Sequence, residues 1–196
     1  MRYGVFGGTF DPPHSGHMAV ARAALDHLQL EQVLFVPAAR NPLKRGRSAA
    51  AKDRLTMTGL AIENQPRFAV TDIEISRGGR SFTIDTIEEL QMTRPGEIWI
   101  ILGTDSLSQI LQWRSPERLI RMCRIGVVVR PGSDLSRVMS TLPEDFRDVI
   151  DEIPMKETKV SSTMIRDLIA RGESPERWLD AKVWEYICES GLYKEE

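Results

Sequence analysis

Short apolar runs alternate with longer segments of helical period along most of this 196-residue chain. The runs are rich in β-branched and aromatic residues, which is typical of strands buried in a parallel sheet. Between them apolar residues recur every three or four positions, which predicts helices. One such stripe is Met18, Ala21, Leu25 and Leu28. The predicted strands are Tyr3–Phe6, Val33–Val36, Phe68–Ile75, Ile98–Leu102 and Ile125–Val129, and further helical segments lie near 51–63, 83–92 and 105–121.

This alternation predicts an α/β fold, a Rossmann-like doubly wound parallel sheet with right-handed crossovers. After about residue 155 the strand signal fades and two helices are predicted, at 161–171 and 180–190. We therefore expect one domain over 1–196, with an α/β core at 1–155 and a small C-terminal helical segment at 156–196. Ligands of such sheets bind beyond the carboxyl ends of the strands, so the informative loops are those that begin at Gly7, Pro37, Gly103 and Arg130.

Composition and charge narrow the classes of function. Apolar residues make up 41% of the chain and charged residues 28%, as in a folded soluble protein. A net charge of −2 argues against a nucleic-acid binder, although local cations still permit anionic substrates. Cys123 and Cys188 form neither a disulfide framework nor a zinc ribbon, and the sequence shows no signal peptide or membrane span. We expect a cytoplasmic protein without a membrane partner, with homo-oligomer formation left open.

The loop after the first predicted strand, GGTFDPPHSGH from Gly7 to His17, carries the clearest chemical signal. Its glycines let a phosphate approach the backbone, and the helix that follows offers free N–H groups and a positive dipole end. His14 and His17, three residues apart, can aim two imidazoles at one anion. The alternatives are an ordinary tight turn, incidental surface histidines, or a zinc site. No third zinc ligand at suitable spacing is evident, so no metal site of the protein's own is predicted.

A second helix start follows Val160, where three hydroxyl residues precede an apolar helix. Such residues make an N-cap whatever the function of the protein. Arg166 changes the interpretation, because it follows Thr163 by three residues and can add a guanidinium fork to the hydroxyl and N–H donors of a phosphate site. The three hydroxyl residues are Ser161, Ser162 and Thr163.

The two segments together resemble the nucleotidylyltransferase superfamily, whose signatures are HxGH and SSTxxR. The ordered pair is a specific signal, and the resemblance, which covers almost the whole chain, is nearest to the bacterial nicotinate mononucleotide adenylyltransferases. This chain has Leu43 where the family often has histidine, and Phe82 where it often has tyrosine. Supporting segments are Asn41–Lys44, Arg77, Ser81–Thr86, Gly103–Ser106, Trp113, Val183, Tyr186, Ile187, Leu192 and Tyr193.

The resemblance implies ATP and nicotinate mononucleotide as substrates, with Mg²⁺ carried by the ATP phosphates. It implies catalytic roles for His14, His17 and Arg166, and ribose contacts from Gly103 and Asp105. The implied ATP site comprises Gly7, Gly8, Thr9, Phe10, His14, His17, Gly103, Asp105, Ser161, Ser162, Thr163 and Arg166, and the implied acceptor site comprises Lys44, Thr83 and Trp113.

Two of these residues, Asp105 and Trp113, have another interpretation. Asp105 suits a helix N-cap equally well. Trp113 stands on apolar helical spacing with Leu107, Ile110 and Leu111, and could be a core residue. Trp99, inside a predicted strand, is assigned to the core.

The chemistry can also be argued from the substrates. A phosphate monoester has its second pKa at about 6, so the acceptor is already dianionic and needs neither a general base nor a covalent nucleophile. It needs relief from repulsion as it approaches the α-phosphate. The alternatives are adenylyl transfer to nicotinamide mononucleotide or pantetheine phosphate, a non-catalytic nucleotide sensor, and a redox enzyme, which the missing GxGxxG motif disfavours.

Overall fold

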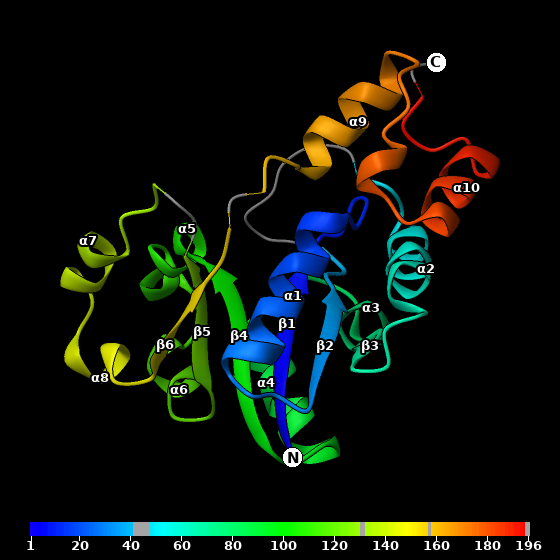
Figure 1. Cartoon of the computed structure of the whole chain (residues 1–196). Helices are drawn as coiled ribbons and strands as arrows, with labels where there is room; N and C mark the ends of the chain where they lie inside the picture. The colour runs from blue at the N-terminus through cyan, green and yellow to red at the C-terminus, as the bar shows by residue number, and fades with distance from the viewer. Residues whose placement is uncertain (41–47, 130–131, 157, 195–196) are drawn as a thin grey trace.

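The computed structural model describes residues 1–40, 48–129, 132–156 and 158–194. In these residues six parallel strands form one sheet in the order β3-β2-β1-β4-β5-β6. Helices lie on both faces of the sheet, which confirms the predicted Rossmann-like α/β class (Figure 1). The strands are β1 Arg2–Gly8, β2 Gln32–Pro37, β3 Phe68–Val70, β4 Glu97–Gly103, β5 Arg124–Val129 and β6 Ile150–Pro154.

The helices follow the predicted alternation over the first half of the chain, and those between β4 and β6 are short. The α-helices are α1 Ser15–His27, α2 Ala51–Ile62, α3 Ile73–Arg77, α4 Thr83–Thr93, α5 Thr104–Leu107, α6 Pro116–Leu119, α7 Leu135–Ser140, α8 Glu144–Arg147, α9 Ser162–Ala170 and α10 Ala181–Glu189. Two 3₁₀ turns, η1 Ile110–Gln112 and η2 Glu176–Trp178, complete the set.

Each face of the sheet has its own apolar core. On one face the stripe of α1 predicted from the sequence is buried with Phe35 of β2 and Ile101 of β4. On the other face Ile84 and Ile87 of α4 pack against Val5 and Ile100. Alternate residues of β1 and β4 thus enter opposite cores, which fixes the register of the central strands because a shift by one residue would expose both sets.

The order of the strands places a crevice between β1 and β4. β1 pairs with β2 on one side and with β4 on the other, with Gly7 opposite Val36 and Gly4 opposite Trp99. The connections that leave β1 and β4 run to opposite halves of the sheet, so their loops separate at the carboxyl end. The loops at Gly7 and Gly103 therefore border the same space.

The predicted strand Phe68–Ile75 is wrong in its second half. β3 stops at Val70, and α3 begins at Ile73. The Thr71 hydroxyl accepts a hydrogen bond from the Ile73 N–H at 3.3 Å, and Ser76 donates to Asp72 at 2.6 Å. These local bonds from hydroxyl and carboxylate side chains start a helical turn despite the alternating apolar pattern.

The predicted helix at 105–121 is also wrong, because the chain breaks it into α5, η1 and α6. Trp113 has an extended backbone, and Ser115 adopts a left-handed conformation with φ of 51° immediately before Pro116. Proline disfavours a helical residue before it and lacks the N–H that a helix interior needs. The tryptophan therefore lies in a break and not on a helix face.

The sequence analysis missed β6, α7 and α8. β6 is the edge strand beside β5 and contains Asp151 and Glu152, which interrupt its apolar pattern. Asp151 accepts hydrogen bonds from Arg124 at 2.7 Å and from the Trp99 indole at 2.8 Å. Trp99 is only 4% exposed, which confirms its assignment to the core.

The C-terminal helices form a third apolar cluster with α2. Met57 of α2 is packed among buried residues of α9 and α10, including Ile165 and Ile187. α10 lies beside α2, and both C-terminal helices stand at the end of the molecule opposite the N-terminus (Figure 1). The two predicted C-terminal helices are confirmed, whereas the division of one domain at residue 155 stays a prediction.

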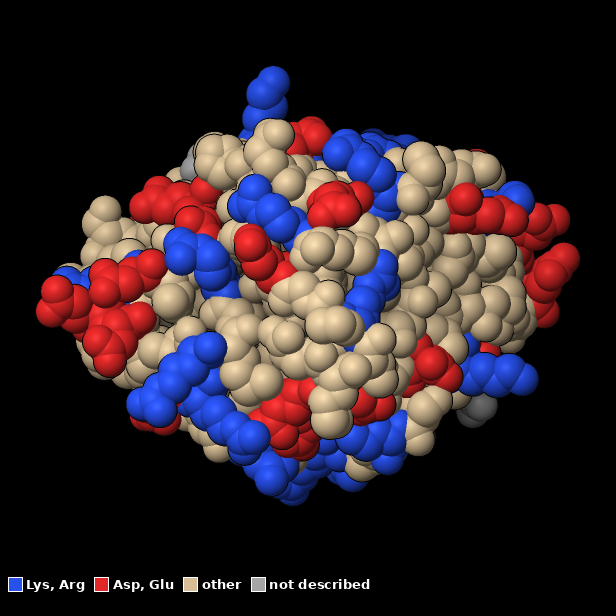
Figure 2. All heavy atoms as spheres, turned by 90° about the horizontal axis from the view of Figure 1, so that it is seen from below, with Lys and Arg blue, Asp and Glu red and all other residues tan. Residues whose placement is uncertain are grey.

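The surface at the amino ends of the strands carries charges of both signs (Figure 2). Arg2 pairs with Glu97 at 3.4 Å, and the Arg2 guanidinium lies 4.8 Å from the centre of the Trp99 ring. Within the residues that the structure describes, no helix has the length and apolarity needed to cross a bilayer.

Replacing Met57 by alanine should lower the free energy of unfolding by about 2–5 kcal/mol, because the fully buried side chain joins α2 to the C-terminal helices. Met92→Ala is the matched control, since Met92 is 78% exposed on α4 and its loss should change stability by less than about 0.5 kcal/mol. Denaturant unfolding of both variants measures the difference. Equal losses would contradict the third cluster as a source of stability.

Candidate active site

Aromatic side chains of the core support the loop after β1. Phe10 has a φ of 50° and is 1% exposed, with its ring centre 5.4 Å from Phe6 and 5.0 Å from His17. A Cβ on Gly8 would meet the Phe10 ring at 2.8 Å, so the glycine is needed for this close approach. Phe10 thus supports the loop from the core, and an ATP contact at this position would come from its backbone.

The two histidines cap α1 and face each other. His14 is the N-cap residue, and its Nδ1 accepts a hydrogen bond from the Gly16 N–H at 3.2 Å. The His17 Nδ1 accepts from the His14 N–H at 3.2 Å, and the ring centres are 3.8 Å apart. When Nδ1 is the acceptor, a neutral imidazole carries its proton on Nε2. Nε2 is therefore the nitrogen that carries the proton in each neutral ring, and both rings stand at the start of α1.

A buried arginine joins three segments around this loop. Arg54 of α2 is 2% exposed and donates hydrogen bonds to the backbone carbonyls of Thr9 at 2.8 Å, Ala49 at 3.1 Å and Ala39 at 3.2 Å. Burial lowers the pKa of Arg54 from its usual value, while the negative charge of Asp11 opposes that change. The guanidinium ties the loop after β1 to the segment after β2.

Asp11 is the carboxylate of this loop, and it is 4% exposed. Its Oδ1 accepts from the Tyr193 hydroxyl at 2.7 Å and from the Ala49 N–H at 3.1 Å. Burial raises the pKa of Tyr193, and the Asp11 charge raises it further, so the phenol stays a hydrogen-bond donor. The C-terminal segment is thereby fastened to the loop after β1.

The start of α9 reaches the same loop. Ser161 is the N-cap residue of α9, and its hydroxyl accepts from the Met164 N–H at 3.1 Å. Ser162 donates to the Pro12 carbonyl at 2.9 Å. The N-cap expected at the hydroxyl run is confirmed, and the second hydroxyl joins two segments that are 150 residues apart.

Arg166 also lies against this loop. Its Nη1 donates to the Asp11 carbonyl at 2.8 Å and lies 3.7 Å from the Asp11 carboxylate, and its Nη2 contacts the Thr163 hydroxyl at 3.4 Å. A Cβ on Gly16 would come within 3.0 Å of Val160, so the starts of α1 and α9 pack closely. The structure thus brings the HxGH and SSTxxR segments together.

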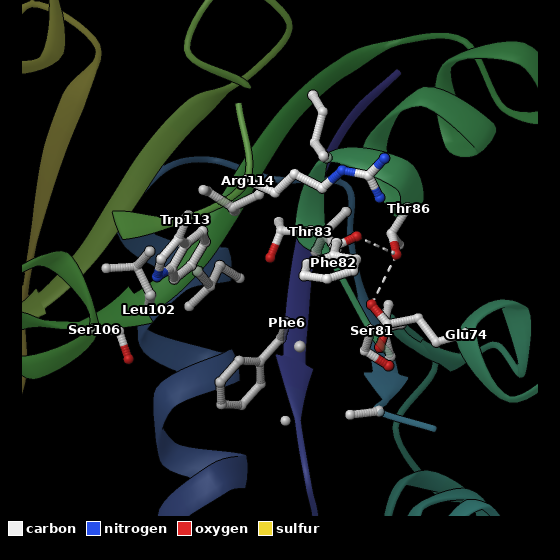
Figure 3. A pocket seen from close by; sticks show the side chains of 18 of the residues that line it. Phe6, Glu74, Ser81, Phe82, Thr83, Thr86, Leu102, Ser106, Trp113 and Arg114 are labelled. Atoms are coloured by element: carbon white, nitrogen blue, oxygen red, sulfur yellow. Dashed lines mark hydrogen bonds between the residues drawn. The ribbon is translucent and has the colours of Figure 1, made fainter. Parts of the chain in front are cut away.

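A cavity of about 390 Å³ opens beside the loop, between the carboxyl ends of β1 and β4 (Figure 3). Gly7 and Gly8 from β1 and Gly103 from β4 form part of its lining. Thr83 at the start of α4 and Trp113 in the break before α6 line it from the other side. The cavity therefore lies where the order of the strands separates the two loops.

Trp113 faces this cavity together with Thr83 (Figure 3). Its ring is half-buried, and within the described parts of the chain its Nε1 is a buried donor without a hydrogen-bond partner. Trp113 also packs against the core beside α4, so it serves the core and lines the cavity. The core interpretation of Trp113 and its predicted place beside a ligand are therefore compatible.

The remaining predicted residues have different outcomes. Asp105 lies in the first turn of α5, whose N-cap residue is Gly103 and lacks a side-chain cap, so the N-cap interpretation of Asp105 is wrong. Thr9 has a buried hydroxyl that finds no hydrogen-bond partner among the described residues. Lys44 falls at 41–47, outside the described residues. The assignments of these residues to ATP or acceptor stay predictions.

Sequence reasoning missed the residues that hold the loop in place. Arg54 stands on the buried face of α2 with Met57, Thr58 and Ile62, at spacings of three, four and eight residues. A charged residue on such an apolar stripe is a signal that could have been recognised. Tyr193 supported the resemblance, but its contact with Asp11 was not predicted, because the two residues lie 182 positions apart in the chain.

The described part of the chain shows no site where protein side chains alone could coordinate a metal ion. Residues 1–40, 48–129, 132–156 and 158–194 contain no group of three or more histidine, cysteine, aspartate or glutamate side chains placed to hold an ion. The donors gathered at the starts of α1 and α9 are N–H, hydroxyl and guanidinium groups, which suit an anion.

Comparison with known proteins connects this geometry to a family. The profile of cytidylyltransferase-like proteins matches residues 5–168. A relative from Bordetella avium, named probable nicotinate-nucleotide adenylyltransferase, is 41% identical over 98% of this chain and 98% of its own. A relative of the same name from Rubrobacter xylanophilus is 40% identical over 99% of this chain and 92% of its own.

Solved structures show the same fold at low sequence identity. Plasmodium falciparum nicotinic acid mononucleotide adenylyltransferase complexed with NaAD has a TM-score of 0.80 at 17% identity, over 98% of this chain and 97% of that one. A putative nicotinate-nucleotide adenylyltransferase from Vibrio parahaemolyticus has a TM-score of 0.70 at 18% identity, over 100% and 96%. With full-length relatives above a third identical, this chain belongs to the cytidylyltransferase-like family and, within it, to the nicotinate-nucleotide adenylyltransferases.

Proposed function

We propose that the protein transfers the adenylyl group of ATP to nicotinate mononucleotide, forming nicotinate adenine dinucleotide and pyrophosphate. The observation that carries this function is the convergence of two helix starts, α1 with its paired histidines and α9 with Arg166, on the loop after β1. This arrangement gathers anion-binding groups beside a cavity large enough for a second substrate. The names of the full-length relatives support the same reaction.

The reaction needs no residue that attacks the substrate. A phosphate oxygen of the acceptor forms a bond to the α-phosphorus of ATP, the bond from that phosphorus to the bridging oxygen breaks, and pyrophosphate leaves with the electron pair. Because both reactants are anions, the barrier includes their mutual repulsion. Nε2–H donors of His14 and His17, the guanidinium of Arg166 and the positive ends of α1 and α9 reduce that repulsion as the phosphates meet.

We assign the triphosphate to the loop after β1 and to the start of α9, and the ribose of ATP to Gly103 and Asp105. The acceptor occupies the cavity, with its pyridinium ring against Trp113 and its carboxylate at Thr83. What supports this division is that Thr83 and Trp113 line one side of the cavity, whereas Gly7, Gly8 and Gly103 line the side towards the loop that carries the histidines. Lys44 stays a predicted acceptor contact.

Magnesium fits this site as a companion of ATP. Asp11, the carboxylate of the loop, already accepts from Tyr193 and Ala49 and pairs with Arg166. Mg²⁺ commonly binds through substrate phosphates and keeps several waters. We therefore expect the ion to be held by triphosphate oxygens, where it would neutralise charge on the leaving pyrophosphate. A cytoplasmic location and the oligomeric state stay predictions.

A pyrophosphate-release assay tests the function directly. The purified protein with ATP and Mg²⁺ should release pyrophosphate when nicotinate mononucleotide is added and not when it is left out. Faster release with pantetheine phosphate would assign the protein to a different acceptor. Nucleotide binding without release for any of these acceptors would favour the sensor and contradict the proposal.

His17→Ala should reduce kcat by about 100-fold or more, because it removes an N–H donor directed at charge that develops as the phosphates meet. ATP binding should weaken far less. Loss of the bond that caps α1 should cost about 1 kcal/mol of stability, so unfolding is measured in parallel. His27→Ala, at the exposed end of the same helix, is the control. An unchanged kcat in a folded His17 variant would remove it from the site.

Arg166→Lys should lower kcat/KM for ATP by about tenfold or more, because an ammonium group cannot make the two-pronged contact of a guanidinium. Steady-state kinetics at varied ATP concentration provide the measurement. The control is Arg171→Lys, since Arg171 is exposed at the end of α9 and pairs with Glu173. Wild-type kinetics for Arg166→Lys would place its guanidinium in a structural role only.

Trp113→Ala should weaken acceptor binding by about 1 kcal/mol and leave ATP binding nearly unchanged, because a stacking contact touches only one substrate. Calorimetric titration with each substrate separates the two affinities. Leu111→Ala is the control, since Leu111 is 46% exposed in the same segment. Equal weakening of both substrates would contradict the separate acceptor cavity.

A further inference from the structure

One basic side chain in the wall of the cavity has no role in the site described so far. Arg114 directly follows Trp113 and lines the same cavity as Thr83. Of the described residues that line the cavity, Arg114 and Glu74 are the charged ones. Glu74 is 7% exposed and accepts a hydrogen bond from the Thr86 hydroxyl at 2.7 Å. Arg114 therefore carries the positive charge of the described lining, and Glu74 carries the negative one.

Two residues at the start of α4 hold the guanidinium in place. Its carbon lies 5.0 Å from the centre of the Phe82 ring, and its Nη1 donates to Asp85 at 3.1 Å. Figure 3 shows Arg114 reaching across from the Trp113 side of the cavity to the Phe82 side. The bond to Asp85 uses one of the five N–H donors of the guanidinium. A second contact, to an anion in the cavity, remains available to the same group.

The start of α4 is itself suited to an anion. Phe82 is the N-cap residue of this eleven-residue helix and makes no side-chain cap. The first N–H groups of α4 and its positive dipole end therefore lie beside the cavity that Thr83 lines. Donors and positive charge thus come together at one wall.

We propose that Arg114 determines acceptor specificity, by adding the charge that distinguishes a ring carboxylate from the uncharged amide. This inference rests on the proposed function, because it takes the pyridine ring to lie against Trp113. The N–H groups at the start of α4 can serve a carboxylate or an amide oxygen, whereas the guanidinium favours the carboxylate. The Arg114 side chain is 55% exposed, so solvent reduces its effect and salt should weaken it.

The test compares Arg114→Gln with the wild-type protein, using kcat/KM for nicotinate mononucleotide and for nicotinamide mononucleotide. The variant should lose about tenfold with the acid and change less than about twofold with the amide and in KM for ATP. Arg114→Lys should keep part of the preference. The wild-type preference should shrink as salt rises, whereas that of Arg114→Gln should depend less on salt.

Arg118→Gln is the matched control. Arg118 is 65% exposed and pairs with Glu88 of α4 at 3.0 Å, but it does not line the cavity. Its loss should leave the acid-to-amide ratio unchanged. Thermal unfolding of all variants checks that the fold is retained, which the exposure of both arginines leads us to expect.

The outcomes separate this inference from the reaction on which it depends. If the wild-type protein turns over nicotinate mononucleotide and Arg114→Gln keeps the full preference for the acid, Arg114 does not determine specificity and the proposed function stands. Equal losses with acid, amide and ATP would also overturn the assignment, because they indicate a structural role. Failure of the wild-type protein to use nicotinate mononucleotide would overturn both proposals.

Discussion

The site depends on a buried guanidinium, that of Arg54, which binds three carbonyl groups from two loops. A charge removed from water is unfavourable unless hydrogen bonds and an opposite charge compensate for it. Here the carbonyls of Thr9, Ala39 and Ala49 supply the bonds, and Asp11 supplies the opposite charge. These hydrogen bonds fix the loops after β1 and β2. Without regular secondary structure, these loops would otherwise expose their backbone groups to water.

This constraint holds the backbone of the loop after β1 in one conformation. The proposed anion-binding groups include backbone N–H groups at two helix ends, and these act only if the backbone is held in one conformation. Arg54 holds one end of the loop, Phe10 supports it from the core, and Arg166 and Ser162 bind it from α9. The HxGH and SSTxxR segments therefore bind each other, and contacts with residues outside these motifs stabilise each of them.

Local patterns predicted most of the fold and the main elements of the site. β1, β2, β4 and β5 follow from apolar runs, and His14 with His17 follows from spacing within one helical turn. Prediction failed where a local bond or a break overrode the pattern. Thr71 and Asp72 start α3 inside a predicted strand, and Pro116 breaks the predicted helix that held Trp113. The sequence does not show directly which residues lie close together in space, so only the structure identified Arg114 as part of the cavity wall.

The bond from Tyr193 to Asp11 spans 182 residues, and those from Arg166 and Ser162 span 155 and 150. Closing a loop between residues so distant costs chain entropy, and this cost falls when nearer contacts have already shortened the loop. The sheet and its first helices can therefore assemble while the loop after β1 still lacks its C-terminal partners. Catalytic competence would then appear after most of the secondary structure, and it would be the first property lost when the C-terminal helices separate from α2.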